Sequence, residues 1–435
     1  MAAASDKARF YLEQYVPELQ EYSRKEIFTP AEITAITRKR SDFEHTLNAR
    51  GSAPSDYAKY AMYEMNLSTL VKKRCKRLGV KQGTNFSGQR TVFFILERGT
   101  KKFPGDMGLW MQYIQFCQKQ KASKKLAKVF TSVLRLKPRE WGLWVLAAKH
   151  YAESMGDMAT ARSYMQRGLR FCKEERKLWG EYVRLEMVYL AKLAARRKVL
   201  GLDEKKEDAV VEEIDGGGED EDVMMLPSIT AEDIQPEEDK GMQEVDAAAL
   251  QRLASAPAFT GGIPVAIFDA AMKQFKDSLE VAEDLFEIVA AFDKVPAATN
   301  ILQHMLDHIR SKHSATAAEL LFCEARLSLF GIDPVGVEFP EALGSCLIKL
   351  NQSNKQAPEK QRQRRLEKKV LLLGPLTRLE DEMDEDVLGV IQSKVREYLA
   401  TLDAAGFVSR LKKEGKEEDA LLVSRIAGLT DVEMT

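Results

Sequence analysis

Three histidines come closest to the spacing of a metal site. His304 and His308 are four residues apart, which places both side chains on one face of a helix, and His313 follows nearby. A two-histidine zinc face of this kind needs a supporting carboxylate, as in the HExxH motif. Asp307 is turned away from that face, because each residue step rotates a helix by about 100°. We therefore expect no metal ion here.

Nucleophilic catalysis has as little support. His45 and His150 lie in expected helices, without the elbow or glycine-rich turn that would set a histidine against a serine or cysteine. The glycine triplet at 216–218 does not form a phosphate-binding loop, because no strand precedes it and no Gly-Lys-Ser/Thr follows it. Dinucleotide and kinase signatures are missing as well. The sequence predicts a protein that is not an enzyme and holds no cofactor.

The cysteines also lack a metal-binding pattern. They are scattered without CxxC spacing, which favours reduced thiols packed in a core over zinc ligands or a disulfide framework. No run of 18 uncharged apolar residues occurs, and the first ten residues lack a secretory core. We therefore expect an intracellular protein without a membrane span. The five cysteines are Cys75, Cys117, Cys172, Cys323 and Cys346.

Basic side chains gather where an anion could bind. Residues 203–246 hold 18 acidic and 3 basic groups, a local charge of −15, whereas the whole chain of 435 residues carries −1. The remainder therefore carries +14 (−1 minus −15). A basic scaffold that bears one acidic loop is attracted to phosphate backbones.

Two runs carry much of this positive charge. Such runs neutralise phosphates with salt-sensitive affinity that does not depend on sequence. The first run contains no acid and lies between two expected helices. Three interpretations stay open for it: contact with RNA or a ribonucleoprotein, a nuclear-import signal, or plain solvation. The second is expected on one helix face opposite Val129 and Phe130, either facing an anionic partner or solvated. The first run is Lys72, Lys73, Arg74, Lys76, Arg77 and Lys81, and the second is Lys121, Lys124, Lys125 and Lys128.

A repeat with a period near 34 residues must position these groups. Trp110, Trp144 and Trp179 are 34 and 35 residues apart, and Pro104 and Pro138 keep the same step, each after an expected helix. A 34-residue unit of two helices is typical of a tetratricopeptide-like solenoid, in which neighbouring pairs stack to bury their apolar stripes. We interpret the aromatic positions as interhelical core. They are Tyr57, Tyr60, Trp110, Tyr113, Trp144, Trp179 and Tyr182.

The periodicity predicts an all-α chain in four parts. Residues 1–54 form an aromatic-rich helical segment that either caps the array or docks on another protein, with a helix beginning at Thr29-Pro30. Residues 55–202 form a first helical array, whose leading helix we expect to be capped by Ser55-Asp56. The acidic residues 203–246 form a disordered loop, and 247–435 form a second array. Within the second array we expect the basic stretch 351–370 to be an exposed helix or linker.

Two motifs resemble the half-a-TPR, or HAT, repeat of RNA-processing scaffolds. The first is the leading helix with Trp179, Tyr182 and Glu186; the second is the Ala-Arg helix 161–169. Further stretches resemble the HAT-repeat, U3 small nucleolar RNA-associated subunits of the UTP-B subcomplex of the small-subunit processome. These stretches are Leu12–Ile33, Thr37–Leu47, Tyr57–Arg74 and Gly262–Met272.

The resemblance implies a nucleolar, non-catalytic scaffold for early maturation of pre-ribosomal RNA. Its partners would be WD-repeat propeller subunits, with non-specific contact to pre-rRNA or U3 small nucleolar RNA and no membrane or small-molecule substrate. One alternative is a helical-repeat protein that reads RNA bases directly, although the columns that recur here are apolar rather than polar. Another is a HAT scaffold in pre-mRNA splicing or 3′-end processing, for which we would expect many more tryptophan-marked repeats.

Overall fold

The computed structural model describes residues 2–80, 88–199, 261–356, 359–379, 383–413 and 415–428. Secondary structure in these ranges is entirely helical, which confirms the predicted all-α class. The chain forms two compact units, residues 1–143 and 144–435, with the division inside α8 (Trp141–His150). Each unit is described by itself. Within the described ranges, no helix is both long and apolar enough to cross a membrane.

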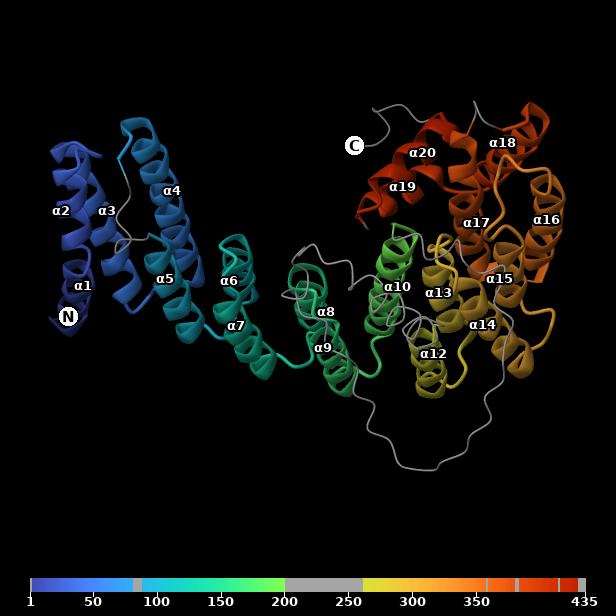
Figure 1. Ribbon diagram of the computed structural model, residues 1–435, viewed down its shortest axis with the longest axis horizontal. Helices are drawn as coiled ribbons and strands as arrows, with labels where there is room; N and C mark the ends of the chain where they lie inside the picture. Colours follow the sequence, from blue (N-terminus) through green and yellow to red (C-terminus); the bar gives the residue numbers. More distant parts are fainter. Residues whose placement is uncertain are drawn as a thin grey trace, which may run out of the picture. The chain divides into compact units, whose positions relative to one another are not determined.

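Unit 1 is a series of antiparallel helices in which α4 packs on α5 and α6 packs on α7 (Figure 1). Local signals fix the helix ends: Thr29 caps α3 with Glu32 in a capping box, and Asp106 accepts a hydrogen bond from the Leu109 N–H at 2.7 Å to cap α6. The helices are α1 (Ala2–Glu13), α2 (Val16–Arg24), α3 (Pro30–Asn48), α4 (Pro54–Leu78), α5 (Gly88–Lys102), α6 (Met107–Lys119) and α7 (Ser123–Leu136).

The aromatic N-terminal segment packs on the helices that follow it. Tyr15 and Tyr22 are buried, and the Arg98 guanidinium of α5 lies 4.0 Å from the ring centroid of Tyr11. Phe10, by contrast, is 59% exposed. These contacts lie within unit 1, and both roles of the segment, capping and docking, stay predictions.

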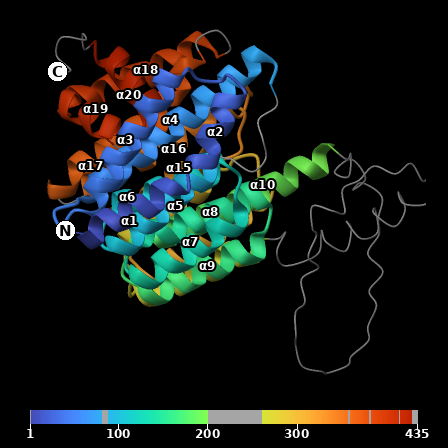
Figure 2. The ribbon, with the colours of Figure 1, turned by 90° about the vertical axis from the view of Figure 1, so that its left-hand side faces the viewer.

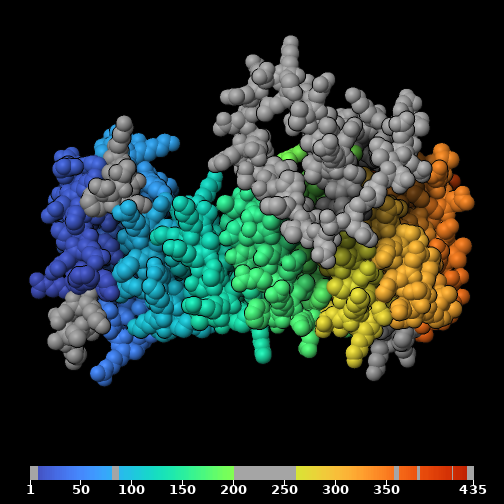
Figure 3. All heavy atoms as spheres, turned by 60° about the horizontal axis from the view of Figure 1, so that its bottom comes forward, coloured from blue at the N-terminus to red at the C-terminus, as the bar shows by residue number. Residues whose placement is uncertain are grey.

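Unit 2 continues with paired helices, and α10 packs on both α12 and α13. Successive colours in Figure 3 show side chains of neighbouring helices in contact along the unit. The helices after α8 are the π-turn η1 (Tyr151–Met155), α9 (Met158–Phe171), α10 (Arg176–Val199), α12 (Gly262–Gln274), α13 (Leu279–Ala290), α14 (Ala298–Lys312), α15 (Ala318–Ser328), α16 (Phe339–Gln356), α17 (Glu359–Leu373), the 3-10 turn η3 (Gly374–Arg378), α18 (Glu385–Ala400), α19 (Ala404–Lys413) and α20 (Glu417–Ala427).

The 34-residue frame recurs in unit 2 as predicted. Ile267 and Phe268 of α12 and Ile301 and Leu302 of α14 are all buried, and α12 packs on α14. Helix α10 is longer than its neighbours at 24 residues, about 36 Å, and Figure 2 shows its C-terminal part extending past α8 and α9. Residues 203–246, the predicted acidic loop, lie outside the described residues.

Two predicted boundaries in unit 1 are wrong. Helix α4 begins at Pro54 rather than after Ser55-Asp56, because Asp56 sits at the third helical position and accepts the Ala53 N–H at 2.8 Å. The same helix runs on to Leu78 and ends at Gly79, whose φ of 66° is a left-handed C-cap. The first basic run up to Arg77 therefore lies on a helix and not between two helices.

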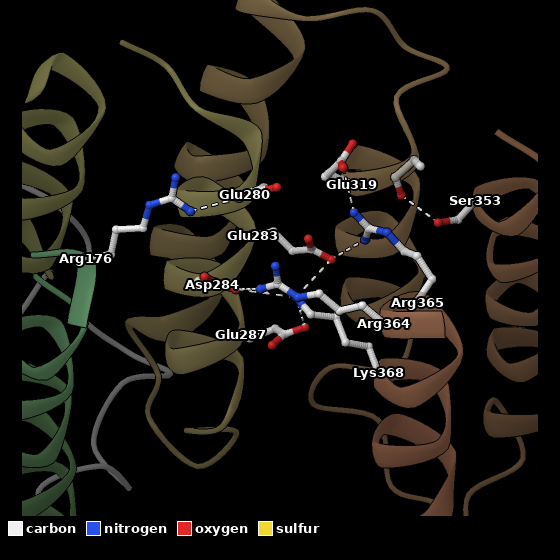
Figure 4. Close-up of polar contacts among 11 residues, drawn as sticks. Arg176, Glu280, Glu283, Asp284, Glu287, Glu319, Ser353, Arg364, Arg365 and Lys368 are labelled. Atoms are coloured by element: carbon white, nitrogen blue, oxygen red, sulfur yellow. Dashed lines mark hydrogen bonds and ion pairs between the residues drawn. The ribbon is translucent and has the colours of Figure 1, made fainter. Parts of the chain in front are cut away.

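The expectation of an exposed stretch at 351–370 is wrong for residues 365–370, where α17 carries buried charges (Figure 4), whereas residues 362–364 are exposed. Arg365 is 4% exposed and its guanidinium pairs with Glu283 of α13 and Glu319 of α15. Lys368 places its ammonium 3.0 Å from a Glu287 carboxylate oxygen. Opposite charges from three helices offset one another, so a stretch of low apolar content becomes part of the core.

Candidate functional site

The aromatic positions of the repeat lie in the helix seams. All seven, Tyr57, Tyr60, Trp110, Tyr113, Trp144, Trp179 and Tyr182, are at most 7% exposed. Trp110 donates its indole N–H to the Pro104 carbonyl, and Trp179 donates to the Lys173 carbonyl, both at 3.0 Å and both six residues back. Each ring therefore packs between helices and also holds the turn before its own helix. These rings have no face free for a ligand.

Glycines allow the close approach of paired helices at these rings. A Cβ on Gly99 of α5 would lie 3.0 Å from the Tyr57 ring, and one on Gly168 of α9 would lie 2.9 Å from Trp144. The two glycines are 69 residues apart, which equals the two repeat steps of 34 and 35. Sequence reasoning missed this column, although its period was visible.

Two buried ion pairs repeat the same geometry. Arg40 of α3 binds Glu64 of α4 through Nε and Nη2 at 2.8 and 2.9 Å, and Arg162 of α9 binds Glu186 of α10 through the same atoms, both at 2.8 Å. Each arginine precedes its glutamate by 24 residues. Helix α3 thus occupies, relative to α4, the position of a repeat's second helix.

The Arg40 guanidinium has additional neighbours. It lies 3.6 Å from a Glu18 oxygen and 4.4 Å from the ring centroid of Tyr15. Burial alone would lower the pKa of Arg40, but the charges of Glu64 and Glu18 outweigh burial and raise it. Arg40 is therefore a permanent cation that joins α2, α3 and α4 inside unit 1.

Four members of the first basic run are exposed near the end of α4. No carboxylate of the described residues lies within 4.0 Å of Lys72, Lys73, Lys76 or Arg77. Arg74 differs, because its guanidinium binds both oxygens of Glu32 at 2.7 and 2.9 Å and donates to the Ile27 carbonyl. Arg74 is therefore committed to holding α4 against α3. Lys81 lies outside the described residues.

The second basic run is only partly helical. Lys121 precedes α7 in a turn with φ of 52°, so the predicted four-residue face reduces to Lys124, Lys125 and Lys128, all exposed. The Lys125 ammonium lies 3.9 Å from the ring centroid of Phe93. That cation–π contact orients Lys125 along α5 without neutralising its charge.

A small hollow lies beside the first run. It has a volume of about 50 Å3 and lies where α4, α5 and α6 meet. Lys72 of the first run lines it together with Lys119 and Gln120, whereas no residue of the second run lines it. We call the exposed residues Lys72, Lys73, Lys76, Arg77, Lys119, Lys121, Lys124, Lys125 and Lys128 the basic surface of unit 1. Cations without nearby carboxylates are suited to phosphate, and such contacts weaken as salt rises.

The histidines of unit 2 have local partners. His304 lies 3.0 Å from Asp269, His308 lies 3.0 Å from Asp277, and His313 lies 2.8 Å from the Asp277 carbonyl. These contacts join α14 to α12 and the turn after it. Across the described residues, no group of three or more histidine, cysteine or acidic side chains is placed to hold a metal ion.

Comparison with known proteins finds one family match, which lies in unit 1, and several relatives that align over longer stretches. Residues 12–93 match the family described as U3 small nucleolar RNA-associated protein 6. A protein of that name from Schizosaccharomyces pombe is 36% identical over 236 residues, 53% of this chain and 48% of the relative. The human homologue is 34% identical over 190 residues, 43% of this chain and 32% of the relative. The Dictyostelium discoideum homologue is 27% identical over 208 residues, 47% of this chain and 34% of the relative.

The aligned part of this chain therefore spans less than half of the length of each of these relatives. The matched family segment includes α2, α3, the Arg40–Glu64 pair and the basic end of α4. None of the relatives bears the name of an enzyme. Through this segment, the chain is similar to the U3 small nucleolar RNA-associated protein 6 family.

Proposed function

We propose that the chain is a non-catalytic scaffold subunit of the U3 ribonucleoprotein within the small-subunit processome. In this proposal it supports early processing of pre-ribosomal RNA and assembly of the small ribosomal subunit in the nucleolus. The observation that carries the proposal is the match of residues 12–93 to a family named for association with U3 small nucleolar RNA. The buried aromatic seams support a scaffold, because they leave the outer helix faces for partners.

The finer parts of the proposal concern partners. WD-repeat propeller subunits of UTP-B would bind the helix faces of the two arrays, residues 55–202 and 247–435. The basic surface of unit 1 would contact pre-rRNA or U3 RNA without reading its sequence, since its groups are lysines and one arginine on exposed helix ends. RNA contact is secondary to protein contact in this scheme.

The test is purification of the tagged chain from cells with protein–protein and protein–RNA crosslinking. The variant changes the four exposed cations at the end of α4, Lys72, Lys73, Lys76 and Arg77, to glutamine. We expect propeller proteins to be recovered with both the parent chain and the variant, and RNA crosslinks to fall only with the variant. A matched control changes four exposed cations of unit 2, Lys273, Lys312, Arg396 and Lys413.

Binding of the purified protein to single-stranded RNA gives a second readout. Each lost phosphate contact lowers the slope of log K against log salt by about 0.7, so the quadruple variant should lower it by up to about 3. Recovery of splicing or 3′-end factors in place of nucleolar proteins would reject the proposal. Tight, salt-resistant binding to one RNA sequence would replace it with a direct RNA reader.

A further inference from the structure

Unit 2 contains a pocket of mixed apolar and charged lining that the proposed function does not use. Its volume is about 540 Å3, within the range of sites that bind small molecules or peptide side chains. Helix α13 ends at one wall, α15 and the loop 329–334 form a second, and α17 with η3 forms a third. Phe339, Leu371 and Leu372 contribute apolar lining. The pocket lies apart from the buried charges of Figure 4, which occupy other positions along α13 and α17.

Two cations line this pocket, the exposed Lys294 and the partly buried Arg326, and neither has a carboxylate within 4.0 Å among the described residues. Arg326 of α15 makes a single long hydrogen bond, from Nη2 to the Ala290 carbonyl at 3.4 Å. No carboxylate of the described residues lies within 4.0 Å of its guanidinium. Burial lowers the pKa of Arg326, with Glu287 the largest opposing charge. A guanidinium has five donors, so Arg326 still has donors to offer a ligand.

The other charged groups at the pocket are more exposed than Arg326. Asp333 accepts the Val335 N–H at 3.1 Å, so part of its capacity is used within the loop. Asp293 and Lys294 are exposed neighbours of opposite sign at the mouth. Arg326 is therefore the least exposed charged residue of the lining, and it makes a single long hydrogen bond.

The loop beside the pocket extends its apolar surface outward. Val337 is 98% exposed and Val335 is 54% exposed, between Pro334 and Phe339, which both line the pocket. Two exposed valines beside the pocket would contact a ligand that continues past its mouth. A polypeptide segment extends in this way, whereas a small molecule does not.

We propose that this pocket is a docking site for a segment of a partner protein that inserts an apolar side chain and places a neighbouring carboxylate on Arg326. The apolar walls and the exposed valines supply contact area. The unpaired guanidinium supplies selectivity, because a carboxylate accepts two parallel N–H bonds from it. The partner segment is therefore apolar with one acidic residue.

Fluorescence anisotropy with three fluorescein-labelled peptides tests this proposal on the full chain. The probe has the sequence GSLLELLGS; one control peptide replaces Glu with Gln, and the other replaces all four Leu with Ala. We expect the probe to bind about tenfold more tightly than the Gln peptide and the Ala peptide not to bind. Equal affinity for the Glu and Gln peptides, or no binding of the probe, overturns the proposal.

Variants connect the binding to this pocket. Arg326→Gln should remove the difference between the Glu and Gln peptides, and Arg326→Lys should restore part of it. Val337→Ser should weaken both peptides several-fold, whereas Ile348→Ser, at a residue that is 61% exposed on α16 outside the pocket lining, should change neither. Thermal unfolding of each variant separates a lost contact from a lost fold. Unchanged probe binding by both Arg326→Gln and Val337→Ser overturns the proposal.

One competing occupant is the chain itself. Residues 219–229 combine four acids with Val-Met-Met-Leu, so their peptide is included as a competitor. Failure of this peptide to displace the probe supports an external partner. Displacement at lower concentration than unlabelled probe would assign the pocket to the chain's own segment and overturn the partner proposal. Neither result bears on the role of unit 1 in the processome.

Discussion

Loss of the Arg40 guanidinium should destabilise unit 1 more than loss of Arg162 destabilises unit 2. Removing one partner of a buried ion pair costs about 3–5 kcal/mol, because the remaining charge is left buried and unpaired. Arg40→Met leaves two buried carboxylates without their cation, Glu64 and Glu18, whose side chains are 1% and 7% exposed. Arg162→Met leaves only Glu186 without its cation. The Arg162 side chain is 13% exposed, so water can reach the site.

We therefore expect Arg40→Met to cost about 4–5 kcal/mol and Arg162→Met about 2–3 kcal/mol. The assay is urea unfolding followed by circular dichroism and tryptophan fluorescence, with the two units analysed as separate transitions. Arg38→Met, at an exposed position on the same helix as Arg40, should stay within about 0.5 kcal/mol of the parent.

Double variants test the reason for the difference. Adding Glu186→Leu to Arg162→Met should restore most of the stability, because an apolar pair of similar volume replaces the ion pair. Adding Glu64→Leu to Arg40→Met should restore only part, because Glu18 still lacks its cation and keeps only the hydrogen bond from the Tyr22 hydroxyl. Equal costs for the two arginine variants, or full rescue by Glu64→Leu, would refute this reasoning.

Three further changes have defined outcomes. Burial, with a smaller effect of other charges, lowers the pKa of Lys369 to about 8. Lys369→Met should therefore stabilise the protein by about 2 kcal/mol below pH 8, measured by thermal unfolding. The gain should shrink toward pH 10, because the lysine of the folded protein loses its proton at lower pH than that of the unfolded chain. Hydrogen bonds from Arg74 and the Thr29 N–H lower the pKa of Glu32 to about 2. Arg74→Gln should raise this pKa in a carboxyl NMR titration. The variant should also lose a stabilisation that the parent protein has above pH 4.5 and loses toward pH 2. Gly168→Ala should cost about 1–3 kcal/mol in urea unfolding, because the new methyl group meets a tryptophan ring.

Matched controls accompany these changes. Lys73→Gln alters an exposed cation next to Arg74 and should leave the Glu32 titration unchanged. Gly142→Ala adds a methyl group with no atom within 4 Å and should not destabilise the protein. A gain from Lys369→Met that persists unchanged at pH 10 would contradict the assignment of that gain to a buried ammonium.

The sequence predicted what depends on local periodicity. Tryptophans at 34 and 35 residues, prolines after helices and the Thr29 capping signal each depend on residues within a few turns, and the structure agrees with them. The turn at Lys121 was missed because a lysine with positive φ leaves no mark in the spacing of charges. Helix periodicity was extended two residues too far at that point, since α7 begins at Ser123.

Contacts between distant helices were not predictable in the same way. Arg365 and Glu283 are 82 residues apart, and a stretch rich in charge normally faces water, so nothing local indicated that α17 is buried. The Arg40–Glu64 pair was not predicted because the intervening repeats lack its equivalent. Glu64 and Glu186 each stand seven residues after the aromatic residue that marks their repeat, Tyr57 and Trp179. At the same position after Trp110 and Trp144 the chain has Cys117 and Tyr151. Aligning the repeats by both residues of the pair would have revealed it.

The scattered cysteines give the folded chain a set of native reporters. All five are buried free thiols, and burial raises the pKa of Cys117 to about 11 and of Cys346 to about 12. Alkylating reagents react with the thiolate, so each cysteine stays unmodified until its own helix pair opens. Cys75 and Cys117 report on unit 1, and the other three report on unit 2. Timed alkylation followed by peptide mass analysis would thus rank the opening rates of individual helix pairs without any engineered label.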